Sequence, residues 1–344
     1  MTREIALNLL QELLNCHAPP GDEAEIDKLI LSEFKQTSAE VSQDGAGNIY
    51  AHIAGDGPRV MVAAHKDEIG MVITNLHDNG RLAVQNIGGS IPWKYGEGAV
   101  DILCGDGTIL RAILSVGGVH TLTGPVPELI NNRALKWDDM TLFTGLSKSE
   151  MIAKGIHAGT RAVVARERKQ LQHIGDFIAS YALDNRMGVV SIILALRQLH
   201  DAKLPLDLTI VATTQEEVGL IGATYAAQVL HPDIAIALDT SPVVHGVPAV
   251  MDERPIIWYK EAVYHNKAEC DALLRIADEL GFGAQPILYN RAASDAGGIK
   301  RAGLASRTVA FGYPRDNSHG YEIAHQDCLL NVTQLLVEYL KQLS

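Results

Sequence analysis

Apolar residues recur at helical spacing in several segments of this chain. Between residues 2 and 16, Ile5, Leu9 and Leu13 fall on one helical face. Thr2 precedes this stretch at the position where an N-cap is favoured. Helices are likewise predicted at residues 23–34, 185–200 and 267–280, from about residue 222 and from about residue 326.

Short runs of branched apolar residues alternate with these helices. Such uninterrupted runs are typical of strands that are buried on both faces of a sheet. The expected strands cover residues 49–53, 59–64, 207–214, 234–238, 285–289 and 305–311. Because strands and helices alternate, the predicted fold class is α/β, with a mixed sheet flanked by helices.

The segment 70–165 has a different pattern. Glycine, proline and asparagine recur there between short β-type runs such as residues 71–74 and 99–103. This pattern is typical of a small antiparallel β domain. We therefore expect an α/β domain formed by residues 1–69 and 166–344, interrupted by an inserted, β-barrel-like domain.

Three of the predicted strands lead into residues that can bind a metal ion. One strand is followed by His65, and another by Asp239. A third strand is followed by the pair Glu216 and Glu217. Chemistry in such sheets gathers in the crevice beyond the carboxyl ends of the strands. Unpaired carboxylates buried together there would be costly, and a bound divalent metal would remove that cost.

Two further segments supply possible ligands. Asp184 lies where a strand-like approach turns into a helix, so it is either a helix cap or a carboxylate that bridges two metals. His319 lies in a segment that would also suit a surface turn, and His325 competes with it for the same role. Asp67 follows His65 by two residues, so both can face the same side and the carboxylate can orient the imidazole.

The adjacent glutamates are the most specific of these features. Neighbouring side chains at a strand end point in different directions, so one can bind metal while the other exchanges a proton with a bound water. The alternative is an ordinary charged loop. Two histidines with three carboxylates suit two divalent ions, such as zinc, cobalt or manganese. The predicted ligands are His65, Asp184, Glu217, Asp239 and His319.

The composition narrows the class of partner. The chain has 344 residues, of which 41 are acidic and 29 are Lys or Arg, giving a formal charge of -12. A nucleic-acid partner would need a basic footprint, and nothing indicates an anionic membrane surface. Without an apolar signal core or membrane-length run, the expected location is the cytoplasm. The four cysteines lack CxxC spacing and are expected to be reduced thiols.

Five motifs then follow one another in a characteristic order. They are HKDEIG at 65–70, LDNRMG at 183–188, QEEVGLIGA at 215–223, ALDTSP at 237–242 and NSHGYE at 317–322. Together they resemble the M42 family of dinuclear metallo-aminopeptidases, which includes glutamyl-aminopeptidase-like and tetrahedral-aminopeptidase enzymes. The resemblance spans nearly the whole chain and includes SDAGGIKRAG at 294–303. It implies the fold of that family and its two-metal site.

The resemblance also implies how the ligands are divided between the two metals. His65 and Asp239 would hold one ion. Glu217 and His319 would hold the other. Asp184 would bridge the two positions.

Further implications concern proton transfer and assembly. Glu216 would be the general base, and Asp67 would orient the neighbouring histidine. Family members usually form tetrahedral dodecamers through the inserted domain, so a homo-oligomer of that type is expected. The chain reads PRDNSHGYE where the family usually has RYIHSPVE, so substrate contacts near this segment are expected to differ. Asp295 keeps its place in AASDAGG, where the family often has GGTDAG.

These features predict a metal-dependent aminopeptidase that removes N-terminal residues from short peptides. A related amide hydrolase, either a deacylase or a carboxypeptidase, remains an alternative because the metal core is common to such enzymes. A non-catalytic peptide-binding scaffold is a second alternative, although a closed structural site would need no free base such as Glu216. A glycosidase is poorly supported, since it needs two carboxylates beside a sugar bond rather than a histidine-containing metal set.

Overall fold

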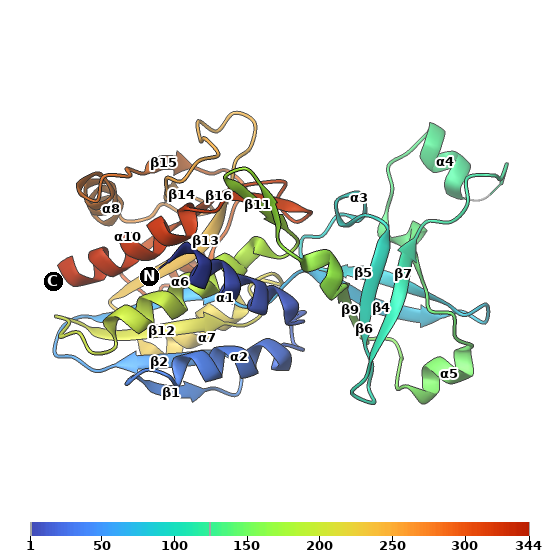
Figure 1. The fold of residues 1–344 in the computed structure, drawn as a ribbon, viewed down its shortest axis with the longest axis horizontal. Helices are drawn as coiled ribbons and strands as arrows, with labels where there is room; N and C mark the ends of the chain where they lie inside the picture. The colour runs from blue at the N-terminus through green and yellow to red at the C-terminus, as the bar shows by residue number, and fades with distance from the viewer. Residues whose placement is uncertain (1, 124, 344) are drawn as a thin grey trace.

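The computed structural model describes residues 2–123 and 125–343, and it contains two bodies side by side (Figure 1). The larger body carries both chain termini and consists of a mixed sheet flanked by helices. The smaller body is a closed β-barrel. The predicted fold class is therefore confirmed.

The large sheet has eleven strands. They are β1 (Glu40–Gln43), β2 (Ile49–Ile53), β3 (Arg59–His65), β10 (Gln172–Ile174), β11 (Phe177–Ser180), β12 (Asp207–Thr213), β13 (Ile234–Pro242), β14 (Ile256–Lys260), β15 (Gln285–Leu288), β16 (Arg307–Asp316) and β17 (Glu322–His325). The main path runs β1-β2-β12-β3-β13-β16-β17-β11-β10, and β14 joins β15 to β16. The central strands β12, β3, β13 and β16 are mutually parallel, so their carboxyl ends meet at one edge of the sheet.

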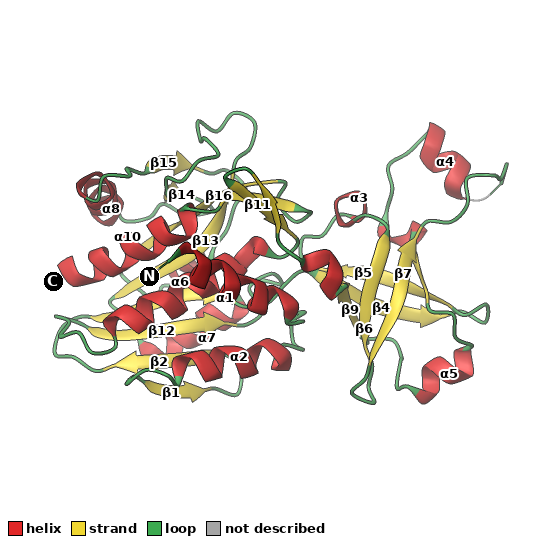
Figure 2. Cartoon of the chain, in the orientation of Figure 1, coloured by secondary structure: helices red, strands yellow, loops and turns green. Residues whose placement is uncertain are grey.

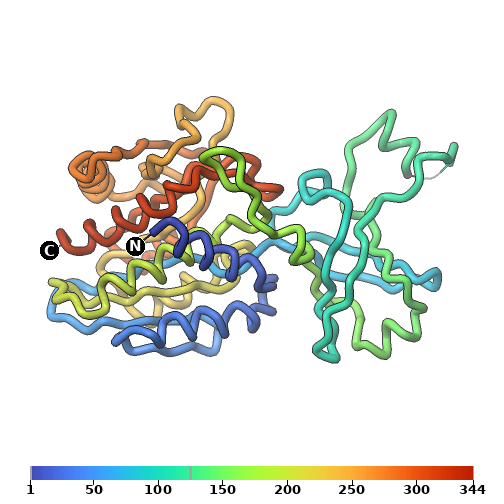
Figure 3. Tube along the Cα trace, viewed as in Figure 1, coloured from blue at the N-terminus to red at the C-terminus, as the bar shows by residue number. Residues whose placement is uncertain are grey.

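Helices cover both faces of this sheet (Figures 1 and 3). They are α1 (Arg3–Asn15), α2 (Ala24–Phe34), α6 (Leu183–Leu199), α7 (Ile221–Leu230), α8 (Lys267–Glu279), α9 (Asp295–Arg301) and α10 (Cys328–Gln342). The core on one face includes residues of α1, α2, α6, α8 and α10, whereas α7 and α9 pack on the other face. None of the described helices is both long enough and apolar enough to cross a membrane.

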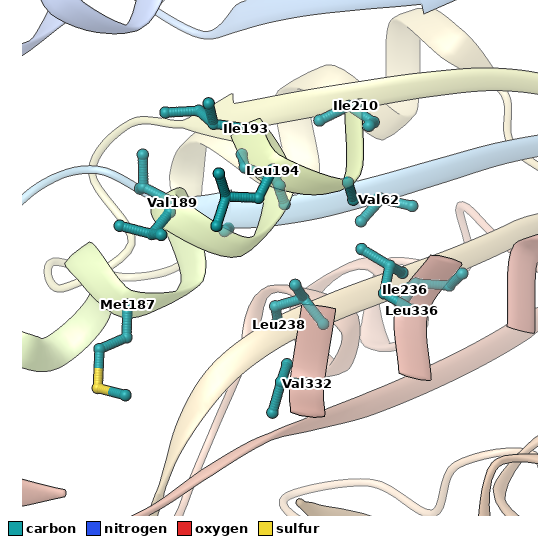
Figure 4. Packing of buried hydrophobic residues seen from close by; sticks show 14 of the residues in the cluster. Val62, Met187, Val189, Ile193, Leu194, Ile210, Ile236, Leu238, Val332 and Leu336 are labelled. Carbon is teal, nitrogen blue, oxygen red and sulfur yellow. The ribbon is translucent and has the colours of Figure 1, made fainter. Parts of the chain in front are cut away.

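Alternation along the central strands explains how both faces are filled. In β3, Val62 belongs to the core under α6, whereas Met61 belongs to the core under α7. Figure 4 shows Val62 and Ile236 on the sheet with Leu194 of α6 and Leu336 of α10. This two-sided burial fixes the positions of the strand ends at which the predicted ligands lie.

The barrel closes in the order β4-β5-β8-β7-β6-β9. Figure 2 shows its strands beside the larger body. Its strands are β4 (Gly70–Leu76), β5 (Arg81–Ile87), β6 (Gly98–Leu103), β7 (Ile109–Ser115), β8 (Thr141–Phe143) and β9 (Arg161–Val164). The connections carry α3 (Pro92–Tyr95), α4 (Pro125–Asn131), α5 (Lys148–Ala153) and the 3₁₀ turn η1 (Trp137–Asp139), and η2 (Arg166–Lys169) follows β9. A separate hydrophobic core fills the barrel.

Most elements expected in the larger body are present near their predicted bounds. Thr2 caps α1, because its hydroxyl accepts a hydrogen bond from the Ile5 amide at 3.4 Å. The sequence reasoning missed the short strands β1, β10, β14 and β17, and it noted β11 only as a strand-like approach to Asp184. Two of these, β1 and β10, have no buried residue, so they lack the apolar run that marks a buried strand. The four cysteines are free, as expected.

Candidate metal centre

The parallel strands bring the predicted ligands to one edge of the sheet. Thr213, the last residue of β12, lies opposite His65, the last residue of β3. On the other side of β3, Ala237 of β13 pairs with Ala63, which places Asp239 two residues further along the same edge. The turn after β12 and the start of α6 supply the remaining carboxylates at this edge.

Two groups of donor atoms form at this edge, and Asp184 belongs to both. Asp184 Oδ1 lies 3.1 Å from His65 Nε2, and the same imidazole nitrogen lies 3.9 Å from Asp239 Oδ1. Asp184 Oδ2 lies 3.5 Å from His319 Nε2, which in turn lies 3.8 Å from Glu217 Oε2. Each oxygen of Asp184 therefore faces a different histidine.

Asp67 contacts both His65 and the turn that follows β12. Its carboxylate accepts hydrogen bonds from the backbone amides of Glu216 at 3.0 Å and Glu217 at 3.1 Å. Asp67 Oδ1 also lies 3.5 Å from His65 Nδ1. The turn itself begins at Gln215, a non-glycine residue with a φ of 52°. Such left-handed backbone is costly and persists only where its surroundings hold it, as these hydrogen bonds do.

Glu216 projects toward the first group without being part of either one. Its Oε2 lies 3.8 Å from His65 Nε2. Burial raises the pKa of Glu216 well above its usual range; His65 opposes this shift, while Asp239 and Glu217 add to it. The position of Glu216 therefore suits a group that accepts and returns a proton beside the first donor group.

The electrostatics of both groups suit a bound cation. Burial and the neighbouring charge of Asp184 raise the pKa of Asp239 well above normal, and burial raises the pKa of Glu217 to about 7. For His319, burial acts to lower the pKa, but Asp184 and Glu217 raise it to about 9. Carboxyl groups crowded in this way repel one another, and a divalent cation would relieve that repulsion. The donor set fits metal binding.

A cleft of about 410 Å³ opens onto these residues. Both donor groups and Glu216 line it. Trp258 and Pro242 contribute apolar surface, and Arg291 and Arg301 also line the cleft. The cleft is therefore large enough to admit part of a small substrate beside the donor atoms.

The structure separates the two histidines that the sequence left in competition. His319 lies beside Asp184 and Glu217, as described above. His325 ends β17, where its ring packs edge-on against Phe177 with the ring centres 5.2 Å apart. Neither donor group includes His325.

Sequence reasoning missed two charged residues that hold the shared carboxylate. Arg315 is buried and donates to Asp184 Oδ2 at 2.8 Å, and it also pairs with Glu322. Glu322 accepts the backbone amides of Asp184 at 2.9 Å and His319 at 3.0 Å. Arg315 is the main influence that lowers the pKa of Asp184 against the effect of burial. In the sequence, the only sign of this pair was an arginine at the end of a buried strand with a glutamate seven residues later.

Asp295 also lies close to this edge of the sheet. Its Oδ2 accepts a hydrogen bond from Thr213 Oγ1 at 2.6 Å, next to His65 across the ladder. The other oxygen, Oδ1, is buried and has no hydrogen-bond partner among the described residues. Burial raises the pKa of Asp295 to about 6, against the lowering effect of His65. Asp295 therefore adds a further acidic group behind the first histidine.

Comparison with known proteins identifies the family. The family model for M42 glutamyl aminopeptidase matches residues 47–335. A protein of Acetivibrio thermocellus, provisionally named an aminopeptidase, is 30% identical over 345 residues, covering 98% of this chain and 99% of that protein. Among solved structures, an aminopeptidase from the archaeon Desulfurococcus kamchatkensis has a TM-score of 0.90 at 26% identity, covering 99% of this chain and 96% of that one.

A second solved structure relates the fold to large assemblies. The TET1 peptidase of Pyrococcus horikoshii, which can assemble into a tetrahedron or a large octahedral shell, has a TM-score of 0.86 at 25% identity. The match covers 98% of this chain and 100% of that one. The M42 family is metal-dependent, in agreement with the donor groups at the sheet edge. The chain thus belongs to the M42 family of aminopeptidases and is a peptidase hydrolase.

Proposed function

We propose that this protein is a dinuclear metal-dependent aminopeptidase that removes N-terminal residues from short peptides. The observation that carries the proposal is the sharing of Asp184 by two groups of donor atoms. A shared carboxylate is the usual bridge between two ions in hydrolytic metal sites. In the proposed division, His65 and Asp239 hold one ion, and Glu217 and His319 hold the other.

The chemistry then divides between the ions and the chain. When bound, two divalent ions such as zinc, cobalt or manganese would lower the pKa of a water molecule and polarise the scissile carbonyl. Glu216 takes the proton from the attacking water and gives it to the leaving amine. Asp67 orients His65 and, through the amides of Glu216 and Glu217, holds the two glutamates in place.

Selectivity for the amino end would come from the free α-amino group of the substrate. That group can bind one of the ions held by the donor groups or an adjacent acidic side chain of the cleft, which places the first peptide bond beside the ions. An acetylated amine can do neither. We therefore expect an exopeptidase rather than an enzyme that cleaves within chains.

The experiment is a panel of aminoacyl chromogenic substrates, each with a free or an acetylated amine. Metal-stripped protein is assayed with zinc, cobalt or manganese added back. Metal-dependent cleavage of the free-amine set alone is the expected result. Cleavage of the acetylated set would assign a deacylase or an endopeptidase instead, and silence with every metal would favour a peptide-binding scaffold.

The role of the general base is tested separately by Glu216→Gln. Losing the base should lower kcat by about 10²–10⁴-fold. Both ions should still bind, because Glu216 belongs to neither donor group. The matched variant Glu217→Gln should instead weaken binding of one ion. A Glu216→Gln protein with its metal and full activity would refute the assignment.

We also infer a homo-oligomer in which the inserted domain, residues 70–165, makes contacts between subunits. The TET1 peptidase, which assembles into closed shells, matches this chain over nearly its full length. The barrel exposes large apolar side chains, among them Trp93, Ile113 and Phe143, which are 62%, 43% and 49% exposed. Such side chains gathered on one small body are typical of an interaction surface. The same proposal places the enzyme in the cytoplasm, where it would act on short peptides.

A further inference from the structure

The connection from β5 through α3 brings the barrel against the segment that carries His319. There His319 Nδ1 lies 3.2 Å from the carbonyl oxygen of Gly89. Lys94 Nζ donates to the carbonyl oxygen of Ser318 at 2.6 Å and to Asn317 Oδ1 at 3.1 Å. Two residues of the barrel thus hold the segment that carries one of the proposed metal ligands.

The contact with Gly89 determines which nitrogen of the imidazole is free. A carbonyl oxygen only accepts hydrogen bonds, so His319 Nδ1 must carry the proton in this contact. In the neutral imidazole that binds a metal, Nε2 then has the free lone pair, and Nε2 is the nitrogen that faces Asp184 and Glu217. Metal-binding histidines commonly donate their other ring nitrogen to such a partner, which fixes both tautomer and ring orientation.

The absence of a side chain at position 89 is part of the same arrangement. A Cβ atom built on Gly89 would lie 2.8 Å from both Cε1 and Nδ1 of His319. Any larger residue would push the ring away from the donor atoms opposite it. Glycine lets the backbone approach closely enough for its carbonyl to bind the imidazole.

The backbone that carries His319 also needs external support. His319 has a φ of 57° and Asn317 a φ of 56°, although neither is glycine. Left-handed backbone at such residues persists when neighbouring groups hold it in place. Lys94 binds the carbonyl of Ser318, which lies between the two, and the Asn317 side chain as well.

The barrel core in turn fixes the connection itself. The indole of Trp137 donates to the carbonyl oxygen of Ser90 at 3.0 Å, directly after Gly89. Tyr95, the residue after Lys94, is buried and packs edge-on against Trp137 with ring centres 5.6 Å apart. Packing inside the barrel therefore holds this connection, and Tyr181 of the larger body also donates to the Tyr95 carbonyl oxygen at 3.0 Å.

We propose that Gly89 and Lys94 are positioning residues for His319, so that the barrel sets the affinity of the metal position formed by Glu217 and His319. The inference rests on the proposed function only in taking these two residues as ligands. It gives the barrel a role in each subunit that is independent of assembly. The other metal position, at His65 and Asp239, should not depend on it.

The test is titration of metal-stripped protein with Co²⁺, followed by calorimetry and by the visible absorption of the bound ion. The parent should bind two ions. Lys94→Met and Gly89→Ala should each weaken the binding of one ion by ten-fold or more, the usual effect of losing a group that orients a ligand. The affinity for the other ion should stay within two-fold of the parent, and Lys94→Arg should recover most of the loss.

Two controls separate positioning from general damage to the barrel. Lys148→Met removes the exposed ion pair between Lys148 of α5 and Asp78, in the turn between β4 and β5, and should leave both affinities unchanged. Glu217→Gln should weaken the same ion as Lys94→Met, which identifies the position affected. Far-UV circular dichroism and thermal unfolding of the metal-free variants should match those of the parent.

Each contrary result has a distinct meaning. A parent that binds two ions, with Lys94→Met and Gly89→Ala binding both at parental affinity, would overturn the positioning role alone. An equal loss in Lys148→Met would also overturn it, because the effect would not be specific to this connection. A parent that binds no ion would overturn the proposed two-metal function, whatever the variants do.

Discussion

Charged side chains at the centre of this molecule are held by partners that are distant in sequence. Asp184 is the clearest case, because Arg315 binds its side chain while Glu322 accepts its backbone amide. A carboxylate can stay ionised when buried only if such partners compensate for lost hydration. Glu322 also accepts a hydrogen bond from the backbone amide of His319, the histidine of the second donor group. One buried acid thus fixes two of the proposed ligands.

Asp101 of β6 is a second buried acid, and it allows a test of pH dependence. Its carboxylate lies 3.0 Å from His17 Nε2 and accepts hydrogen bonds from Arg111 at 2.7 Å and the Arg166 amide at 3.3 Å. Although burial acts to raise its pKa, these partners lower it to about 2. We expect Asp101→Asn to lower the stability at pH 7 by about 1–3 kcal/mol.

The sign of the pH effect follows from the depressed pKa. The folded protein holds Asp101 ionised to about pH 2, whereas the unfolded chain protonates it near its ordinary value of 3.8. The stabilisation is therefore complete above about pH 5 and is lost as the pH falls from 4 toward 2. Thermal unfolding of parent and variant at pH 7, 5 and 3.5 measures this. Asp56→Asn, at an exposed position, serves as the control; a gap between parent and Asp101→Asn that widens below pH 4 would contradict the prediction.

At the scale of elements, the close approach of β13 and β16 positions one end of the metal centre. Gly312 of β16 lies opposite Asp239 in the parallel ladder. A Cβ atom on Gly312 would lie 1.6 Å from the Asp239 carbonyl oxygen, so no larger residue fits without moving a strand. We expect Gly312→Ala to lower the free energy of unfolding by more than about 2 kcal/mol, and to weaken metal binding.

A glycine without neighbours provides the comparison for this prediction. A Cβ atom on Gly45 would meet no atom within 4 Å, and its backbone is not left-handed. Gly45→Ala should therefore change stability by no more than about 0.5 kcal/mol. Thermal unfolding and Co²⁺ titration of both variants make the measurement. Equal stability of the two variants would show that the strands separate more easily than their contacts indicate.

The helices and strands that could be predicted from the sequence are those whose burial produces a regular pattern of apolar residues along the chain. The central strands have such a pattern, and since parallel neighbours share their carboxyl ends, the convergence of His65 and Asp239 could be predicted from the order of strands and helices alone. Strand β10 could not, because every residue in it is exposed and its pairing depends on a neighbour. The contact between Lys94 and Ser318 spans 224 positions and depends on how two bodies dock. A regular pattern of apolar residues along the chain gives no information about such a contact.

At the scale of the whole molecule, buried polar contacts join the barrel to the larger body. Asp101 of β6 lies 3.0 Å from His17 Nε2, while Lys169 lies 3.2 Å from Nδ1 of the same ring and donates to Glu68 Oε1 at 2.9 Å. Glu68 comes directly after Asp67, and its pKa is lowered by Lys169 against the effect of burial. A shift of the barrel would disturb these pairs, since a buried charge without its partner is costly. The two bodies are therefore expected to move little relative to one another.

Because the barrel is held against the larger body, its outer surface would face other subunits of the proposed homo-oligomer in a fixed direction. Ile113 of β7 and Phe143 of β8 are paired neighbours with outward, exposed side chains. We expect Phe143→Glu to lower the molar mass measured by light scattering during size-exclusion chromatography, because a charge would be buried in the subunit contact. Ile174→Glu, on β10 outside the barrel, is the control at a site that is 59% exposed, and it should leave the mass unchanged. A large assembly that survives Phe143→Glu, or a parent that is already a monomer, would show that this face of the barrel does not join subunits.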